Sequence, residues 1–105
     1  MIIDVTGENF EAEVLSSDKP VLVDFWADWC PSCKALTPTI QQIAEQFADR
    51  LKVCKCDVDQ AKELSEQFRI MSIPALLFFK QGELVGQHIG TLTKGALTAM
   101  INEVL

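Results

Sequence analysis

Short apolar-rich segments recur along the chain and predict the strands of one sheet. Five segments have this character: residues 2–5, 21–26, 51–58, 75–80 and 84–89. Within 21–26, apolar residues occupy neighbouring positions, which is typical of a central strand covered by helices on both faces. Gln81-Gly82 predicts a tight turn that joins the last two strands as a hairpin.

Helically spaced apolar residues fill the intervals and predict four helices. These helices cover residues 9–17, 33–50, 61–68 and the stretch that follows Thr93. The apolar face of the longest consists of Leu36, Ile40, Ile43 and Phe47. Pro38 is expected to kink that helix, and Thr93 is expected to cap the last one. The order βαβαβαββα predicts an α/β fold in one domain, residues 1–105, with parallel βαβ units first and a closing hairpin.

Composition and charge narrow the possible partners. The chain has 105 residues, of which 49% are hydrophobic, so it can fill one core. Its net charge of −6 argues against nucleic acid and anionic membranes, because both attract basic surfaces. The first residues lack the basic and apolar regions of a signal peptide, and no segment approaches the ~20 apolar residues of a membrane span. We therefore expect a cytoplasmic monomer.

The stretch Cys30-Pro31-Ser32-Cys33 carries the clearest chemistry. It follows an apolar strand and opens a helix, so both sulfurs meet at a helix N-terminus, where the helix dipole stabilises a thiolate. In a reducing compartment such a pair is more often catalytic or metal-binding than structural. Zinc usually takes four ligands, and the chain has one histidine, His88, and no second pair with this spacing. We interpret Cys30 as a nucleophile of lowered pKa and Cys33 as the resolving thiol.

The chain resembles the thioredoxin family over nearly all of its length. Besides the cysteine pair, the resemblance rests on Val23-Asp24-Phe25-Trp26-Ala27, Trp29, Lys34, Pro38, Lys55, Asp57, Asp59, Ile73-Pro74, Gly82 and Gly90. It implies the thioredoxin fold, in which a mixed sheet of about five strands is flanked by four helices. It also implies a protein disulfide reductase that needs no cofactor or metal, acts on disulfide-containing proteins and is recycled by a thioredoxin reductase.

One dipeptide departs from the family pattern. Typical members carry Gly-Pro between the two cysteines, whereas this chain carries Pro31-Ser32, a pair similar to those of glutaredoxins and periplasmic thiol oxidases. Ser32 has a backbone N–H that a proline lacks, and we expect it to donate to the Cys30 thiolate. Such a bond would raise the reduction potential about 30–60 mV above the approximate −270 mV of thioredoxin. A more oxidising thiol oxidase or isomerase is therefore the alternative, followed by a metal or iron–sulfur binding module and a non-catalytic docking subunit.

A carboxylate inside an apolar strand is the second chemical feature. Burial is expected to raise the pKa of Asp24, and a residue at a solvated strand edge with no role is the alternative. The resemblance implies that Asp24 accepts and returns the proton of the buried cysteine, with Lys55 on the neighbouring strand as its partner.

The resemblance also implies a target-binding groove around Cys30. It would consist of Trp29, Pro31, Ser32, Ile73, Pro74 and Gly90. The Ile73-Pro74 peptide would be cis, and the Ile73 backbone would pair with an extended target segment.

Two further cysteines alternate with Lys55 on one predicted strand. Cys54 and Cys56 therefore share one face of the sheet, and their spacing of ~6–7 Å is too long for a relaxed disulfide. We interpret them as small buried hydrophobic residues, with a secondary redox or regulatory thiol as the alternative.

Overall fold

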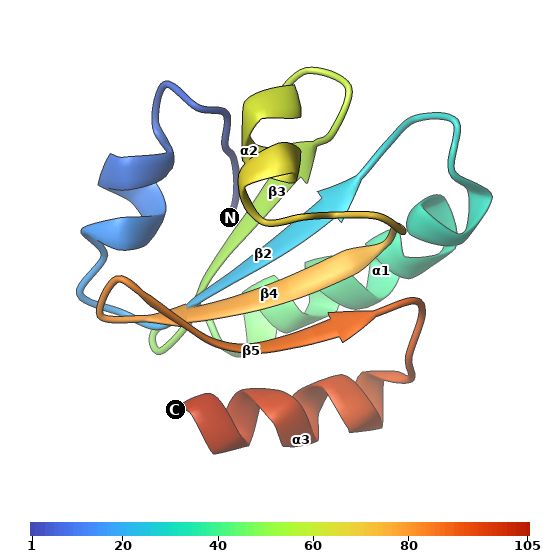
Figure 1. The fold of residues 1–105 in the computed structure, drawn as a ribbon. Helices are drawn as coiled ribbons and strands as arrows, with labels where there is room; N and C mark the ends of the chain where they lie inside the picture. Colours follow the sequence, from blue (N-terminus) through green and yellow to red (C-terminus); the bar gives the residue numbers. More distant parts are fainter.

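A five-stranded sheet runs through the middle of the molecule, with helical segments on both of its faces (Figure 1). The computed structural model describes residues 1–105. The strands are β1 (Ile2–Asp4), β2 (Val21–Trp26), β3 (Lys52–Asp57), β4 (Ala75–Lys80) and β5 (Glu83–Ile89). Their order across the sheet is β1-β3-β2-β4-β5. β3 runs parallel to β1 and β2, whereas β4 is antiparallel to β2 and β5, so the predicted mixed sheet is confirmed.

Four helical segments cover the sheet, as the apolar spacing predicted. They are η1 (Glu11–Leu15), α1 (Pro31–Gln46), α2 (Lys62–Gln67) and α3 (Lys94–Val104). Buried residues of η1 and α2 share one core cluster, and buried residues of α1 and α3 share another. The two clusters lie on opposite faces of the sheet, so the predicted layers are confirmed.

Two of the predicted helices have different bounds in the structure. The helix expected over 33–50 begins at Pro31 and ends at Gln46. It ends early because the chain turns back at Phe47, whose carbonyl accepts from the N–H groups of both Arg50 and Leu51. The helix expected over 9–17 contains only a π-helical segment, η1.

The alternation of side chains along β2 divides the core between the two faces. Val21, Val23 and Phe25 belong to the cluster under η1 and α2, whereas Leu22 belongs to the cluster under α1 and α3. These four residues are all fully buried, which confirms β2 as a central strand. The same alternation turns Asp24 toward the α1 side of the sheet.

None of the helices combines the length and the apolar character that crossing a membrane would require.

The N-terminus of α3 offers a test of helix capping. Thr93 is the predicted N-cap, and its hydroxyl accepts from the backbone N–H of Ala96 at 3.1 Å. We expect Thr93→Ala to lower the free energy of unfolding by about 1 kcal/mol, because one N–H of the first turn loses its acceptor. Urea unfolding of both proteins measures the difference. The matched control is Thr91→Ala, since the exposed Thr91 side chain makes no hydrogen bond, and an equal loss in both variants would contradict the assignment.

Candidate active site

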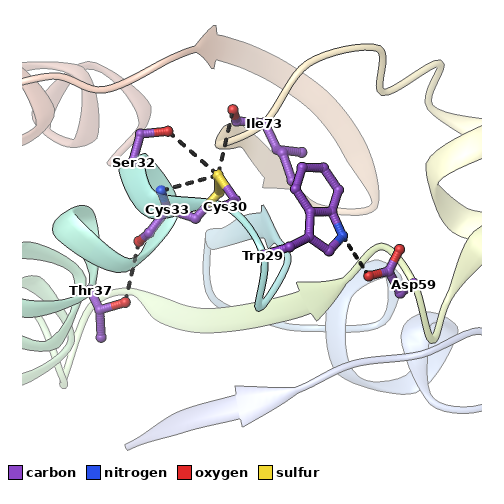
Figure 2. The surroundings of a disulfide bond; sticks show 7 residues. All are labelled: Trp29, Cys30, Ser32, Cys33, Thr37, Asp59 and Ile73. Atoms are coloured by element: carbon purple, nitrogen blue, oxygen red, sulfur yellow. Dashed lines mark hydrogen bonds between the residues drawn. A yellow bond between two sulfur atoms is a disulfide. The ribbon is translucent and has the colours of Figure 1, made fainter.

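The two cysteines lie at the start of α1, just after the C-terminal end of the central strand β2 (Figure 2). Cys30 is the N-cap residue, Pro31 takes the first helical position and Cys33 lies in the first turn. The thiols form a disulfide with their Cα atoms 5.3 Å apart. The Cys30 Sγ atom accepts from the backbone N–H of Cys33 at 3.2 Å. A sulfur in this position faces the positive end of the helix dipole, which favours a thiolate when the disulfide opens.

Two more polar groups approach the Cys30 sulfur (Figure 2). The Ser32 Oγ atom lies 3.4 Å away, and the Ile73 carbonyl oxygen lies 3.9 Å away. The predicted donor, the Ser32 backbone N–H, makes no such bond in this disulfide form. The backbone donor is Cys33, because an N-cap side chain reaches the N–H of the second or third helical residue and the third is the one aligned here. Ser32 approaches the sulfur with its hydroxyl instead.

A tryptophan lies beside the disulfide and is hydrogen-bonded to a carboxylate that is far away in the sequence (Figure 2). The Trp29 side chain is 65% exposed, and its indole Nε1 donates to Asp59 Oδ2 at 2.8 Å. Asp59 follows the end of β3, and its own N–H donates to Asp57 Oδ1. The sequence marked Asp59 only as a point of resemblance, because no local pattern connects two residues that lie 30 positions apart.

A groove of about 560 Å³ opens next to Cys30. Its lining consists of Trp29, Cys30, Pro31, Val58, Asp59, Lys62, Ser65, Ile70, Met71, Ser72 and Ile73. Of the six residues expected around the groove, Trp29, Pro31 and Ile73 line it. Ser32 faces the sulfur without lining the groove, and Pro74 is buried, with its carbonyl accepting from the Gly90 N–H.

The loop that carries Ile73 has free backbone groups. The Ile73–Pro74 peptide bond is cis, as expected. No N–H or C=O of residues 71–73 takes part in a backbone–backbone hydrogen bond. These groups can therefore pair with another extended chain.

Asp24 lies inside the protein without a hydrogen-bonding partner. It is 1% exposed, and neither carboxyl oxygen accepts a hydrogen bond. Burial raises its pKa from 3.8 to about 6, and the charge of Lys55 offsets part of that rise. The buried position and the raised pKa agree with the prediction, and a solvated strand edge is excluded.

Lys55 lies opposite Asp24 in the register of β2 and β3. Leu22 and Val53, which pair two positions earlier, both lie in the core under α1, so Asp24 and Lys55 face that side as well. The Lys55 ammonium lies 4.4 Å from the centre of the Trp26 ring and forms no ion pair with the carboxylate. Lys55 therefore acts on Asp24 through its charge rather than through a hydrogen bond.

Cys54 and Cys56 are separate from this site. Both are fully buried free thiols in the cluster under η1 and α2, whereas Cys30 and Cys33 pack at the start of α1. Burial raises the pKa of each buried thiol from 9.0 to about 12. They are therefore thiols at neutral pH, and the four cysteines do not converge on one point.

The arrangement defines a class of protein. A cysteine pair at a helix N-terminus, with one sulfur in an apolar groove, suits thiol–disulfide exchange. The thioredoxin family model matches residues 1–103. Thioredoxin C-2 of Corynebacterium nephridii is 42% identical over 97% of this chain and 94% of its own length. A thioredoxin of Acidithiobacillus ferridurans is 45% identical over 99% of this chain and 96% of its own.

A third relative is longer than this chain. A bifunctional thioredoxin reductase/thioredoxin of Mycobacterium leprae is 43% identical over 98% of this chain, which corresponds to 22% of that protein. The chain belongs to the thioredoxin family. It is a thiol–disulfide oxidoreductase that reduces protein disulfides.

The raised pKa of Asp24 generates a prediction about stability. A carboxyl group whose pKa is higher in the folded state binds its proton more tightly there, so the fold loses stability as the pH rises from about 4 through about 6. The rise from 3.8 to about 6 corresponds to about 3 kcal/mol. We therefore expect Asp24→Asn to raise the free energy of unfolding by about 2–3 kcal/mol at pH 7 and by close to zero at pH 4.

Urea unfolding of the oxidised proteins at both pH values measures this effect. Asp49→Asn is the control, because Asp49 is exposed and its substitution is expected to change little at either pH. A gain for Asp24→Asn of the same size at pH 4 and pH 7 would show that ionisation is not its cause.

Proposed function

We propose that Cys30 is the attacking thiolate of this reductase and Cys33 the resolving thiol. Cys30 lines the groove and Cys33 does not, and this difference is the observation that carries the assignment. The Cys30 thiolate attacks one sulfur of a target disulfide, forms a mixed disulfide and releases the other target sulfur as a thiolate. Cys33 then attacks Cys30 Sγ, which forms the Cys30–Cys33 disulfide and releases the second target thiolate. Two electrons pass from the protein to the target.

In this scheme, Asp24 would accept the proton of the Cys33 thiol and later return it. A carboxyl group with a pKa of about 6 can both accept and return a proton near neutral pH. It is buried on the α1 side of the sheet, and Cys33 lies in the first turn of α1. Lys55 would tune that pKa through its charge, since it offsets part of the rise caused by burial.

The groove would receive an extended segment of the target protein. Trp29, Pro31 and Ile73 form its walls around Cys30, and the free backbone at Ile73 would pair with the target chain. The Ser32 hydroxyl would donate a hydrogen bond to the Cys30 sulfur. Pro74 and Gly90 would stabilise the loop that carries Ile73 through the hydrogen bond between their backbones.

The electrons would come from a thioredoxin reductase. The Mycobacterium leprae relative supports this pairing, because its name combines a thioredoxin reductase with a thioredoxin. This chain matches 22% of that protein, which leaves most of its length for the reductase. The protein itself would work as a monomer in the cytoplasm, without a cofactor of its own.

A more oxidising role, as a thiol oxidase or isomerase, is the second candidate. The observation in its favour is the Ser32 hydroxyl, 3.4 Å from the Cys30 sulfur. A hydrogen bond to the thiolate stabilises the reduced form and raises the reduction potential.

Replacement of each cysteine separates the two proposed roles. We expect Cys30→Ser to abolish reduction of a protein disulfide such as that of insulin. We expect Cys33→Ser to form a stable mixed disulfide with the target, because the resolving thiol is missing. Turbidity measures the reduction, and mass spectrometry of the unreduced mixture detects the adduct.

Cys56→Ala is the control for these variants, because its buried thiol has a pKa of about 12 and is expected to be inert. An adduct carried by the Cys30→Ser protein rather than by the Cys33→Ser protein would reverse the assignment.

Ser32 variants test whether the Ser32 hydroxyl raises the reduction potential of the Cys30–Cys33 pair. We expect Ser32→Ala to lower the reduction potential by about 30 mV, because the thiolate loses one hydrogen bond worth about 1.5 kcal/mol. Ser32→Pro is expected to give the same value, since the Ser32 N–H makes no bond to the sulfur in this structure. Equilibration against a dithiol buffer measures all three potentials. A wild-type value well above about −180 mV would favour the oxidase or isomerase.

A further inference from the structure

Met71 is an exposed apolar side chain at the active-site groove. It lies in the loop between α2 and β4, and it is 91% exposed. Single exposed methionines are ordinary on protein surfaces. Met71, however, lines the same groove as Cys30, together with the exposed Trp29. Its exposed surface is therefore continuous with the place where a target disulfide must bind.

We propose that Met71 determines target specificity. It forms the wall of a subsite that favours targets with a large apolar residue two positions from the reactive cysteine. The inference rests on the proposed function, since the target segment must lie in this groove.

The distance of two positions follows from the backbone. The Ile73 carbonyl oxygen lies 3.9 Å from Cys30 Sγ, so a target cysteine that reaches this sulfur lies against Ile73. The backbone of residues 71–73 is free of backbone–backbone hydrogen bonds. Met71 lies two residues before Ile73 in the chain, so a target segment that follows this loop brings its residue two positions from the cysteine near Met71, whichever way it runs.

The chemistry of the walls selects an apolar side chain. Val58, Ile70 and Ile73 line the same groove as Met71, and the groove volume of about 560 Å³ accommodates a large side chain. The flexible thioether of methionine can adapt to apolar partners of different shape. Ile70 and Met71 also line a second hollow of about 410 Å³, whose other lining residues, Ser65, Glu66 and Arg69, are polar. Asp59, Lys62, Ser65 and Ser72 also line the groove, and of these Lys62 competes with this interpretation, because its positive charge would favour an acidic target residue.

Three disulfide peptides distinguish these possibilities. They differ only in the residues two positions before and after one cysteine, which are leucine, serine or glutamate. We expect the reduced wild-type protein to reduce the leucine peptide with a kcat/KM about tenfold higher than that of the serine peptide. We expect Met71→Ser to remove that preference and Met71→Leu to retain it, because the lost contact is apolar burial. A tenfold effect corresponds to about 1.4 kcal/mol.

Two controls separate recognition from chemistry. Leu84→Ser replaces an exposed apolar residue of β5 outside the groove and is expected to leave the preference unchanged. The reduction potential, and the rate with a small aliphatic disulfide that has no peptide segment, are expected to be the same in all variants. A change in either quantity with Met71→Ser would show that the substitution perturbs the sulfur chemistry and would overturn the inference.

The remaining outcomes are also decisive. Equal rates for the leucine and serine peptides with the wild-type protein would overturn the role of Met71 and leave the reductase function intact. Faster reduction of the glutamate peptide would assign specificity to Lys62 instead. A failure to reduce any of the peptides or insulin would contradict the proposed function itself.

Discussion

The hydrogen bond from the Cys33 N–H to the Cys30 sulfur is the contact on which the site depends. It makes a cysteine the cap of α1, so one contact both begins the helix and exposes the sulfur to the positive end of its dipole. The rest of the fold holds this helix end in place. β2 delivers the chain to it, and Leu36 and Ile40 anchor α1 on the sheet. The position of the Cys30 sulfur and its reactivity therefore have the same physical cause.

Asp24 lowers the stability of the folded protein. A carboxyl group without a hydrogen-bonding partner in a fully buried strand destabilises the folded state whenever it is ionised. An apolar residue on β2 would pack there without that penalty. The Lys55 charge reduces the penalty only in part, since its ammonium lies over the Trp26 ring rather than on the carboxylate. Groups with strongly perturbed pKa values of this kind are typical of functional sites.

The environment of the sulfur and the groove beside it have different structural sources. The hydrogen-bond donors next to the sulfur are local, since the Cys33 N–H and the Ser32 hydroxyl both belong to the first turn of α1. The groove is assembled from segments far apart in the chain: Trp29 is held by Asp59 beyond β3, and Ile73 and Met71 come from the loop before β4. Side chains in this loop can therefore vary without disturbing the cap at Cys30.

Local patterns in the sequence determined the strands, the approximate positions of the helices, the place of the cysteine pair at a helix N-terminus and the burial of Asp24. Each of these follows from apolar spacing or from the conformational preferences of residues such as Pro31 within one or two turns of chain. The end of α1 at Gln46 and the approach of the Ser32 hydroxyl were missed, because they depend on how the chain turns back and on which N–H aligns with the sulfur. Only the tertiary structure decided the Trp29–Asp59 bond and the place of Met71 in the groove. Such contacts join residues from different elements, and no spacing along the chain records which loops the sheet brings together.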